Sequence, residues 1–140
     1  MASISYNIDF NNNFLKLRPQ ISLRFILFSF LSFDSYDIDF NHELFVKKTR
    51  YFFFFKKKYS ISTRKLFYID YSYKKLSTKD GDYDFYTISL IDKYKNYHFL
   101  GSYIGPEFFS KAQKDSLKFV ENISNILNLP LGKPTGARFL

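Results

Sequence analysis

The side chains that could catalyse a reaction or hold a metal ion are few in this sequence. Its two histidines, His42 and His98, do not stand at a metal-ligand spacing from each other or from a cysteine, because the chain contains no cysteine. The absence of cysteine also excludes disulfides, zinc–thiolate sites and cysteine nucleophiles. We therefore expect both histidines to have structural roles.

The carboxylates show no catalytic or metal-binding pattern either. Asp80, Asp82 and Asp84 alternate along the chain as in a calcium-binding loop, but the glycine and the closing glutamate of such a loop are not at the required positions. Asp37 and Asp39 belong to the polar side of an alternating segment, and the five glycines form no phosphate-binding loop. The sequence predicts a protein that is not an enzyme, with no catalytic residues, no metal site and no cofactor.

One chemical feature does stand out, a basic cluster between Leu44 and Ile69. This window holds no acidic residue, and the rest of the chain has as many acidic as basic residues, so the window carries the whole net charge of +8. Such a localised charge favours acidic or phosphate-bearing partners. The candidate binding residues are Lys47, Lys48, Arg50, Lys56, Lys57, Lys58, Arg64 and Lys65.

Three interpretations of the basic cluster stay open. Its lysines could simply solvate strand edges and prevent edge-to-edge pairing. They could lie on an anionic membrane surface. Because aromatic residues alternate with them, they could also bind RNA, with rings stacking on bases and cations meeting phosphates.

The composition limits how much such runs can mean. Phe, Tyr, Ile, Asn and Lys are abundant and Ala, Gly, Pro and Trp are scarce, which is typical of A/T-rich codons and indicates an AT-rich genome such as that of an organelle. A run of Phe or Lys is therefore weaker evidence of function than usual. At 140 residues the chain fits one domain, and its 19 Phe and 12 Tyr supply a core.

The N-terminal third gives two expectations. Residues 1–20 are polar and rich in asparagine, which predicts a flexible lead-in without a cleavable signal peptide or a transit peptide. The longest apolar stretch, Ile21–Phe33, contains Arg24 and is too short for a membrane-spanning helix, which needs about 20 residues. We expect it to insert shallowly, to lie at an interface, or to form a buried strand.

The elements that follow are predicted from hydrophobic periodicity. Alternation of apolar and polar residues predicts six or seven short strands with no helix between them, hence an antiparallel meander sheet or a partly open barrel. We expect turns at 41–43, at Lys56–Lys58, at 79–82 and at 92–96. The predicted strands include Tyr36–Phe40, Leu44–Val46, Tyr51–Phe55, Leu66–Tyr73, Phe85–Ile91 and Tyr97–Tyr103.

The period changes after Gly105. From Ser110 to Leu129 the apolar residues recur every three or four positions, which predicts one amphipathic helix with a capping box at Ser110 and Gln113. Pro130 ends it. The sequence thus predicts an α+β fold, with a single domain over residues 21–131 and a loose tail over 132–140.

This order of features resembles the pleckstrin-homology-like architecture. More narrowly, it is similar to the soluble part of the photosystem I assembly protein family of plastids and cyanobacteria. The resemblance rests on Phe40-Asn41 at a strand end, the basic-aromatic segment Lys47–Lys58, the strand Leu66–Tyr73 and, above all, the closing phrase Asn125–Leu131. The chain departs from that family in two ways: the family has two membrane-spanning helices before this domain, and its tryptophans are missing here.

The resemblance implies a function and a place. It implies a non-catalytic accessory or assembly factor at a photosynthetic, thylakoid membrane in the plastid (chloroplast), where the basic cluster faces protein complex subunits or the anionic membrane surface. The alternatives are an RNA-binding or ribosome-associated basic module, or an uncharacterised organellar reading frame.

Overall fold

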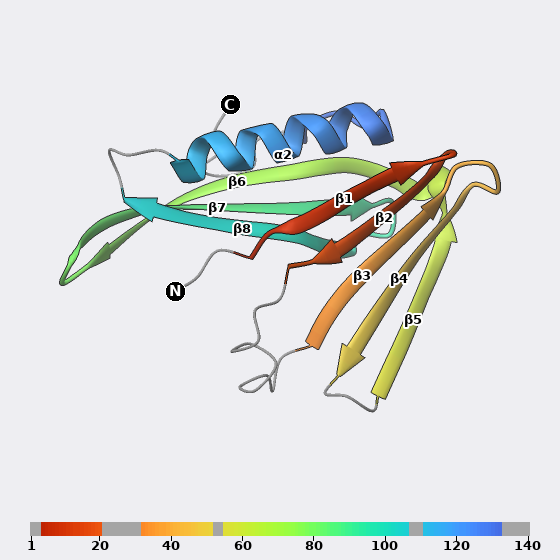
Figure 1. Cartoon of the computed structure of the whole chain (residues 1–140), viewed down its shortest axis with the longest axis horizontal. Coiled ribbons are helices and arrows are strands. Elements are labelled where there is room, and N and C mark those ends of the chain that lie inside the picture. The colour runs from red at the N-terminus through yellow and green to blue at the C-terminus, as the bar shows by residue number, and fades with distance from the viewer. Residues whose placement is uncertain (1–3, 21–31, 52–54, 107–110, 133–140) are drawn as a thin grey trace. The chain divides into compact units, whose positions relative to one another are not determined.

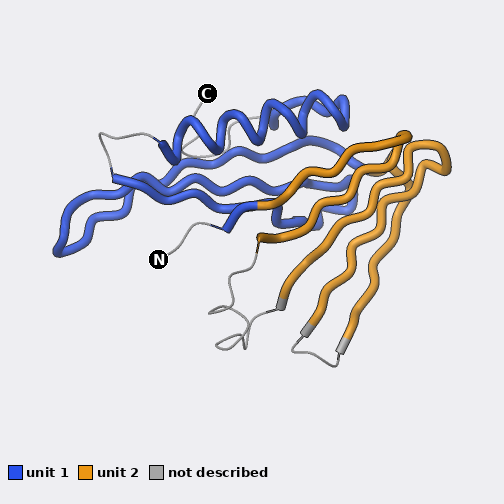
Figure 2. Tube along the Cα trace, in the orientation of Figure 1, with its two compact units in different colours: residues 1–5, 66–140 blue, residues 6–65 orange. Residues whose placement is uncertain are grey.

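The structure is a computed structural model that describes residues 4–20, 32–51, 55–106 and 111–132. The chain divides into two compact units (Figure 2). We call residues 6–65 the five-stranded unit, and residues 1–5 with 66–140 the helix-capped unit.

The five-stranded unit is an antiparallel meander in which each strand pairs with the next along the chain (Figure 1). A short 3₁₀ helix, η1 (Thr63–Lys65), follows the last strand. The strands are β1 (Tyr6–Asn11), β2 (Phe14–Pro19), β3 (Ser32–Asp39), β4 (Leu44–Tyr51) and β5 (Phe55–Ser62).

Alternation places the completely buried apolar side chains of this unit on one face of its sheet. Leu15, Leu17, Tyr36, Ile38 and Phe45 are completely buried. The strand register pairs Leu17 with Tyr36, and Ile38 with both Leu15 and Phe45, so these side chains share a face. They form the core of the five-stranded unit.

The flexible lead-in predicted for residues 1–20 is wrong for residues 6–19, which form the hairpin β1–β2. Asn12 and Asn13 are its two-residue turn, with φ angles of 53° and 58°. Asparagine tolerates this left-handed conformation better than other side chains, and two such residues match the turn that joins twisted antiparallel strands. Asn12 and Asn13, which contributed to the prediction of a flexible lead-in, are turn residues.

The turn predicted at Lys56–Lys58 is also wrong, because these lysines lie inside β5. An edge strand with a solvated face tolerates lysine, although lysine favours strands only weakly. Of the strand predicted at Tyr51–Phe55, the structure places the two ends in β4 and β5, and residues 52–54 lie outside the described residues. Residues 21–31 of the apolar stretch Ile21–Phe33 also lie outside them.

The helix-capped unit contains the helix that the sequence predicts. Its strands β6 (Leu66–Thr78), β7 (Gly81–Asp92) and β8 (Tyr97–Pro106) form an antiparallel sheet in that order, followed by α2 (Lys111–Leu127). The turns predicted at 79–82 and 92–96 lie at the β6–β7 and β7–β8 connections. The predicted cap residue Ser110 lies outside the described residues.

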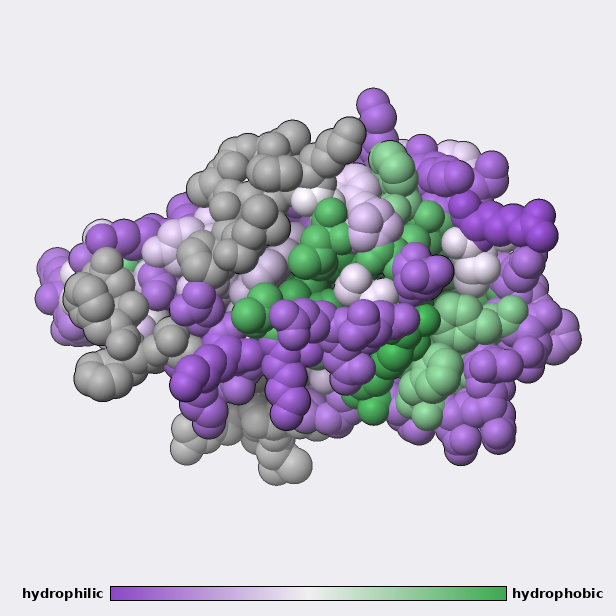
Figure 3. All heavy atoms as spheres, turned by 90° about the horizontal axis from the view of Figure 1, so that it is seen from above, coloured by the Kyte–Doolittle hydropathy of each residue, from purple (hydrophilic) through white to green (hydrophobic). Residues whose placement is uncertain are grey.

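Helix α2 covers its sheet with one face. The ring centroids of Phe119 and Tyr103 are 6.3 Å apart. The Ser116 and Tyr71 hydroxyl oxygens are 2.7 Å apart, which is a buried hydrogen bond between helix and sheet. Seen from above, the molecule shows a band of hydrophilic residues with hydrophobic residues beside it (Figure 3). The buried helix residues are Ala112, Ser116, Phe119, Val120, Ile123 and Leu127.

The predicted α+β class is therefore confirmed. Among the described residues there are eight strands in two antiparallel sheets that do not close, followed by one C-terminal helix, which fits the open meander and not the barrel. The count exceeds the predicted six or seven because the hairpin β1–β2 was not expected.

Both edges of the three-stranded sheet carry an extra backbone segment. Ile4 exchanges two hydrogen bonds of 2.8 Å with Ser102 on β8. On β6, the Ile69 amide donates to the Pro130 carbonyl at 3.0 Å, and the Gly132 amide donates to the Ile69 carbonyl at 2.6 Å. These segments satisfy edge groups that would otherwise be open to pairing.

The second of these segments explains the closing phrase Asn125–Leu131 structurally. Helix α2 ends at Leu127, and Asn128 follows with a φ of 52°, the left-handed conformation that commonly terminates helices. The Ser124 hydroxyl then donates to the Leu129 carbonyl at 2.7 Å, and Pro130 brings the chain to the edge of β6. The phrase reverses the chain from helix to sheet.

We expect Gly132→Ala to destabilise this closure, because an added Cβ would overlap the Tyr68 ring and lie 3.2 Å from the Ile69 carbonyl oxygen. The ring or the backbone must move, which costs about 1–3 kcal/mol of unfolding free energy. Urea unfolding measures the loss. In a Tyr68→Ala background the same substitution should cost clearly less, and an equal cost would show that the ring is not the obstacle.

Candidate functional site

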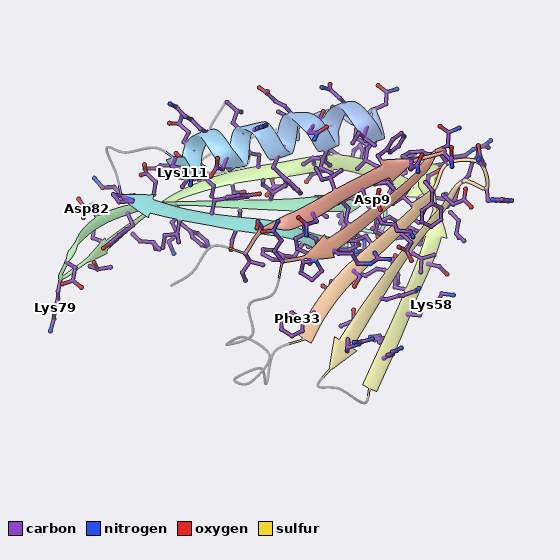
Figure 4. All side chains as sticks on the ribbon, viewed as in Figure 1. Asp9, Phe33, Lys58, Lys79, Asp82 and Lys111 are labelled. Atoms are coloured by element: carbon purple, nitrogen blue, oxygen red, sulfur yellow. The ribbon has the colours of Figure 1, made fainter. Side chains whose placement is uncertain are left out.

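The strand register brings four members of the basic cluster together on the polar face of the five-stranded unit. Lys48 lies directly opposite Lys58, and Arg50 lies directly opposite Lys56. Partners in an antiparallel pair share a face, and so do alternate residues of one strand. All four side chains are exposed, and Figure 4 labels Lys58 on β5. We call Lys48, Arg50, Lys56 and Lys58 the cationic quartet.

The neighbouring strands give the quartet one carboxylate and one aromatic ring. On β3, Asp37 lies 3.3 Å from Lys48 Nζ, but it also binds the Arg18 guanidinium at 2.5 Å, so its charge is shared. Phe33, labelled in Figure 4 at the start of β3, lies opposite Arg50 and is half-buried. The polar face thus has a ring beside a row of cations.

The quartet has an excess of positive charge. Within the described part of the chain, no carboxylate forms an ion pair with Arg50, Lys56 or Lys58. Like charges directly opposite on a sheet repel each other. An anion with several charges, or an anionic surface, would relieve this repulsion in two adjacent rows of the sheet at once.

The other four predicted residues lie elsewhere in the same unit. Lys47 and Lys57 alternate with the quartet and are therefore on the opposite face, where Lys47 is half-buried. Arg64 and Lys65 follow β5 in η1, and the Arg64 guanidinium binds Glu43 with a 3.0 Å ion pair. The cluster that is continuous in sequence is split in space.

Sequence reasoning missed Arg18, Phe33 and Asp37 as parts of this face. Each comes from β2 or β3, strands outside the basic window, and only the register brings them beside it. The available signal was the two-residue spacing of Lys48 with Arg50 and of Lys56 with Lys58, which indicates a shared face on a strand.

Each histidine hydrogen-bonds an aspartate of its own turn. In the β3–β4 turn, His42 Nδ1 lies 2.7 Å from Asp39 Oδ2, and this hydrogen bond holds the pKa of Asp39 below its ordinary value. In the β7–β8 turn, the buried His98 Nε2 lies 2.9 Å from Asp92 Oδ2. Among the described residues, no three His, Asp or Glu side chains gather as they would to hold a metal ion.

The aspartates that resembled a calcium loop are spread along the β6–β7 hairpin. Asp82 binds Lys75 across the hairpin at 3.5 Å, and Asp84 accepts a 2.7 Å hydrogen bond from the Tyr73 hydroxyl. A separate polar hollow of about 360 Å³ lies at the β1–β2 turn of the five-stranded unit, lined by Asp9, Asn11, Asn12, Phe14 and Lys16. It brings together no arrangement of acid, base and nucleophile.

Fold and site together define an α+β protein of two open antiparallel sheets with a cationic face on one of them. Comparison of the chain with known protein families, with curated proteins and with solved structures finds no match. No helix in the described ranges is both long and apolar enough to cross a membrane.

Proposed function

We propose that this protein is a non-catalytic accessory or assembly factor at a photosynthetic, thylakoid membrane of the plastid, where its cationic quartet binds the anionic membrane surface beside protein complex subunits. The observation that carries the proposal is the pairing of Lys48 with Lys58 and of Arg50 with Lys56 on one exposed face. The photosynthetic membrane comes from the sequence resemblance, and the charge chemistry comes from this face.

The quartet is suited to a lipid surface by its position and its surroundings. It lies on the last two strands of its sheet, and each basic residue near an anionic bilayer contributes about 1 kcal/mol of attraction. The Phe33 ring beside Arg50 adds apolar area, which strengthens interfacial binding when charge already holds the protein at the surface. The face therefore combines the two terms that peripheral membrane binding needs.

Charge reversal tests the proposal. We expect Lys56→Glu, Lys57→Glu and Lys58→Glu together to lower sedimentation with vesicles containing anionic lipid at least about tenfold, because Lys56 and Lys58 are half of the quartet. The matched control reverses three exposed lysines of α2, Lys111, Lys114 and Lys118, and changes the net charge equally.

Circular dichroism should show that both triple variants keep the wild-type secondary structure. Equal loss in both variants would mean that net charge alone controls binding. Unchanged sedimentation of the variant with Lys56→Glu, Lys57→Glu and Lys58→Glu would contradict the proposed membrane site.

A second function, RNA binding or ribosome association, is favoured by one observation. The half-buried Phe33 ring shares a row with Arg50 and Lys56, and a ring beside cations can stack on a base while the cations meet phosphates. This function predicts a salt-dependent gel shift with single-stranded RNA that Phe33→Ser weakens. Absence of binding at low salt would remove it.

A further inference from the structure

Among the described residues, β5 is the last strand of its sheet, and no other described strand pairs with the side of β5 that faces away from β4. The sheet order within the described ranges is β1-β2-β3-β4-β5, in which β5 pairs with β4 (Figure 1). The edges of the three-stranded sheet differ, because Ile4 hydrogen-bonds to the β8 edge and Pro130 and Gly132 hydrogen-bond to the β6 edge.

The hydrogen-bond pattern identifies which β5 residues point outward. The Thr63 amide donates to the Glu43 carbonyl at 3.0 Å, and this contact continues the β4–β5 ladder by one residue pair. In antiparallel sheets the hydrogen-bonded pairs alternate along the strands. The pairs that exchange hydrogen bonds with β4 therefore include Lys57 and Tyr59, and the backbone groups of Lys56, Lys58 and Ser60 point away from β4.

The pairing of β2 with β3 leads to the same assignment of the residues whose backbone groups point toward or away from β4. The Phe40 amide donates to the Asn13 carbonyl at 3.0 Å between β3 and β2, which turns the backbone groups of Asp37 toward β4. Asp37 pairs with Val46, so the groups of Thr49, three positions further, turn toward β5 and meet Lys57. Within the described residues, no hydrogen bond outside the β4–β5 ladder engages Lys56, Lys58 or Ser60.

We infer that the β5 edge binds an extended segment of a partner protein as an added strand, and that this segment alternates acidic with apolar residues. Strand addition to an open edge is a general way of binding peptides. The Lys56 and Lys58 side chains would lie opposite the acidic positions, since cross-strand partners share a face. The apolar positions would lie on the face of Tyr59 and Ile61, which are half-buried.

The lysines also decide against the simplest competitor, a second copy of β5. Two β5 strands pairing edge to edge would place lysines against lysines, which repel. An acidic strand would instead place carboxylates opposite these lysines, and the two would attract each other. The edge lysines thus suppress self-association and select an acidic partner by the same charge.

The chain already contains an example of the partner that we infer. Strand β3 alternates Tyr36, Asp37, Ile38 and Asp39 along the inner side of β4, with Asp37 bound to Lys48 and the apolar residues buried. A segment of this kind therefore fits beside the same lysine-bearing hairpin. The β5 edge offers the equivalent position on the outer side.

The test uses the full chain and a labelled peptide with the sequence of residues 34–40. Fluorescence anisotropy at low salt should show binding, and replacing the Asp residues of the peptide with Asn should weaken it at least about tenfold. Lack of binding by the Asp peptide, or equal binding of the two peptides, would overturn the inference.

A proline substitution separates strand addition from simple charge attraction. Ser60→Pro removes an outward amide but no hydrogen bond to β4, and proline is tolerated at such edge positions. It leaves all four quartet residues in place. We expect the peptide to bind Ser60→Pro at least about tenfold more weakly than wild type, and Ser60→Ala to bind as wild type does. Wild-type affinity of the proline variant would overturn the inference.

Hydrogen exchange on the wild-type chain gives an answer that does not depend on the variant folding. On addition of the peptide, the amides of Lys56, Lys58 and Ser60 should gain protection, and those of Lys57 and Tyr59 should be protected already. Protection without this alternation would contradict strand addition. Vesicle sedimentation should be the same for Ser60→Pro as for wild type. Failure of the peptide to bind would therefore leave the proposed membrane function standing, and failure of vesicle binding would leave strand addition standing.

Discussion

Replacing Asp92 with alanine should lower the unfolding free energy by about 3–5 kcal/mol, because it removes the acceptor around which the β7–β8 turn is built. Asp92 is completely buried. Its carboxylate accepts hydrogen bonds from the amides of Tyr94 at 2.8 Å and Asn96 at 3.0 Å, and it lies 2.9 Å from His98 Nε2. Alanine leaves these donors without their acceptor, and His98 is itself buried.

Two further variants separate the histidine contact from the backbone contacts. Asp92→Asn keeps an oxygen acceptor and should cost clearly less than Asp92→Ala. In a His98→Leu background, Asp92→Ala should also cost less, since the buried imidazole no longer needs a partner. Urea unfolding followed by circular dichroism measures each step. A loss below about 1 kcal/mol for Asp92→Ala would contradict the central role of this carboxylate.

The helix and the sheet that it covers could be predicted because their periodicities are local. The alternation of apolar and polar residues predicts a strand at Leu66–Tyr73, and β6 contains it, with Ile69 and Tyr71 both less than 4% exposed. From Ser110 onward the spacing of the apolar residues changed to three and four, and the helix runs over Lys111–Leu127. Both patterns depend only on neighbours along the chain.

The sequence does not predict the hairpin β1–β2, because the asparagines of its turn resemble the general composition of the chain. Asn11, Asn12 and Asn13 looked like a polar lead-in, and the abundance of asparagine in the whole chain made that interpretation easy. Asn12-Asn13 is nevertheless a sequence that accepts positive φ at both positions, and Leu15 and Leu17 alternate directly after it. Turn chemistry was the better guide here.

The cationic quartet could be predicted only in part, because a face depends on register. The basic window was visible in the sequence, but placing Lys56–Lys58 in a turn hid the fact that Lys57 and Lys58 point to opposite faces. A shift of one residue in the pairing would exchange these faces entirely. Register is set by the buried side of the sheet and by the turn lengths, which are properties of several strands together.

The buried side therefore determines what the polar side can bind, and Tyr36 is the largest of the completely buried side chains described in the five-stranded unit. Tyr36→Ala should lower the unfolding free energy of the five-stranded unit by about 3–5 kcal/mol, as for other large aromatic side chains in cores. The side chain is completely buried, and its ring centroid lies 5.9 Å from that of Tyr6 and 5.8 Å from that of Phe45. Its loss leaves a cavity that three strands surround.

High pH offers a second measurement on the same residue. Burial raises the pKa of the Tyr36 hydroxyl above its ordinary value, so above pH of about 10 the unfolded chain ionises at this position while the folded chain does not. The unfolded state then binds fewer protons, and stability falls as the pH rises. Tyr36→Phe removes this group and should lose less stability than wild type over the same rise.

The matched control for Tyr36→Ala is Leu44→Ala, which truncates an exposed apolar side chain on the adjacent strand β4 and should change stability by no more than about 0.5 kcal/mol. Because β3 carries Asp37 and Phe33 beside the quartet, Tyr36→Ala should also reduce vesicle sedimentation at temperatures where the wild type stays folded. Retained sedimentation in a variant shown by circular dichroism to have lost its strands would mean that the lysines bind lipid as an unstructured basic segment. Vesicle binding that disappears together with the strands would instead show that it depends on the pairing of Lys48 with Lys58 and of Arg50 with Lys56.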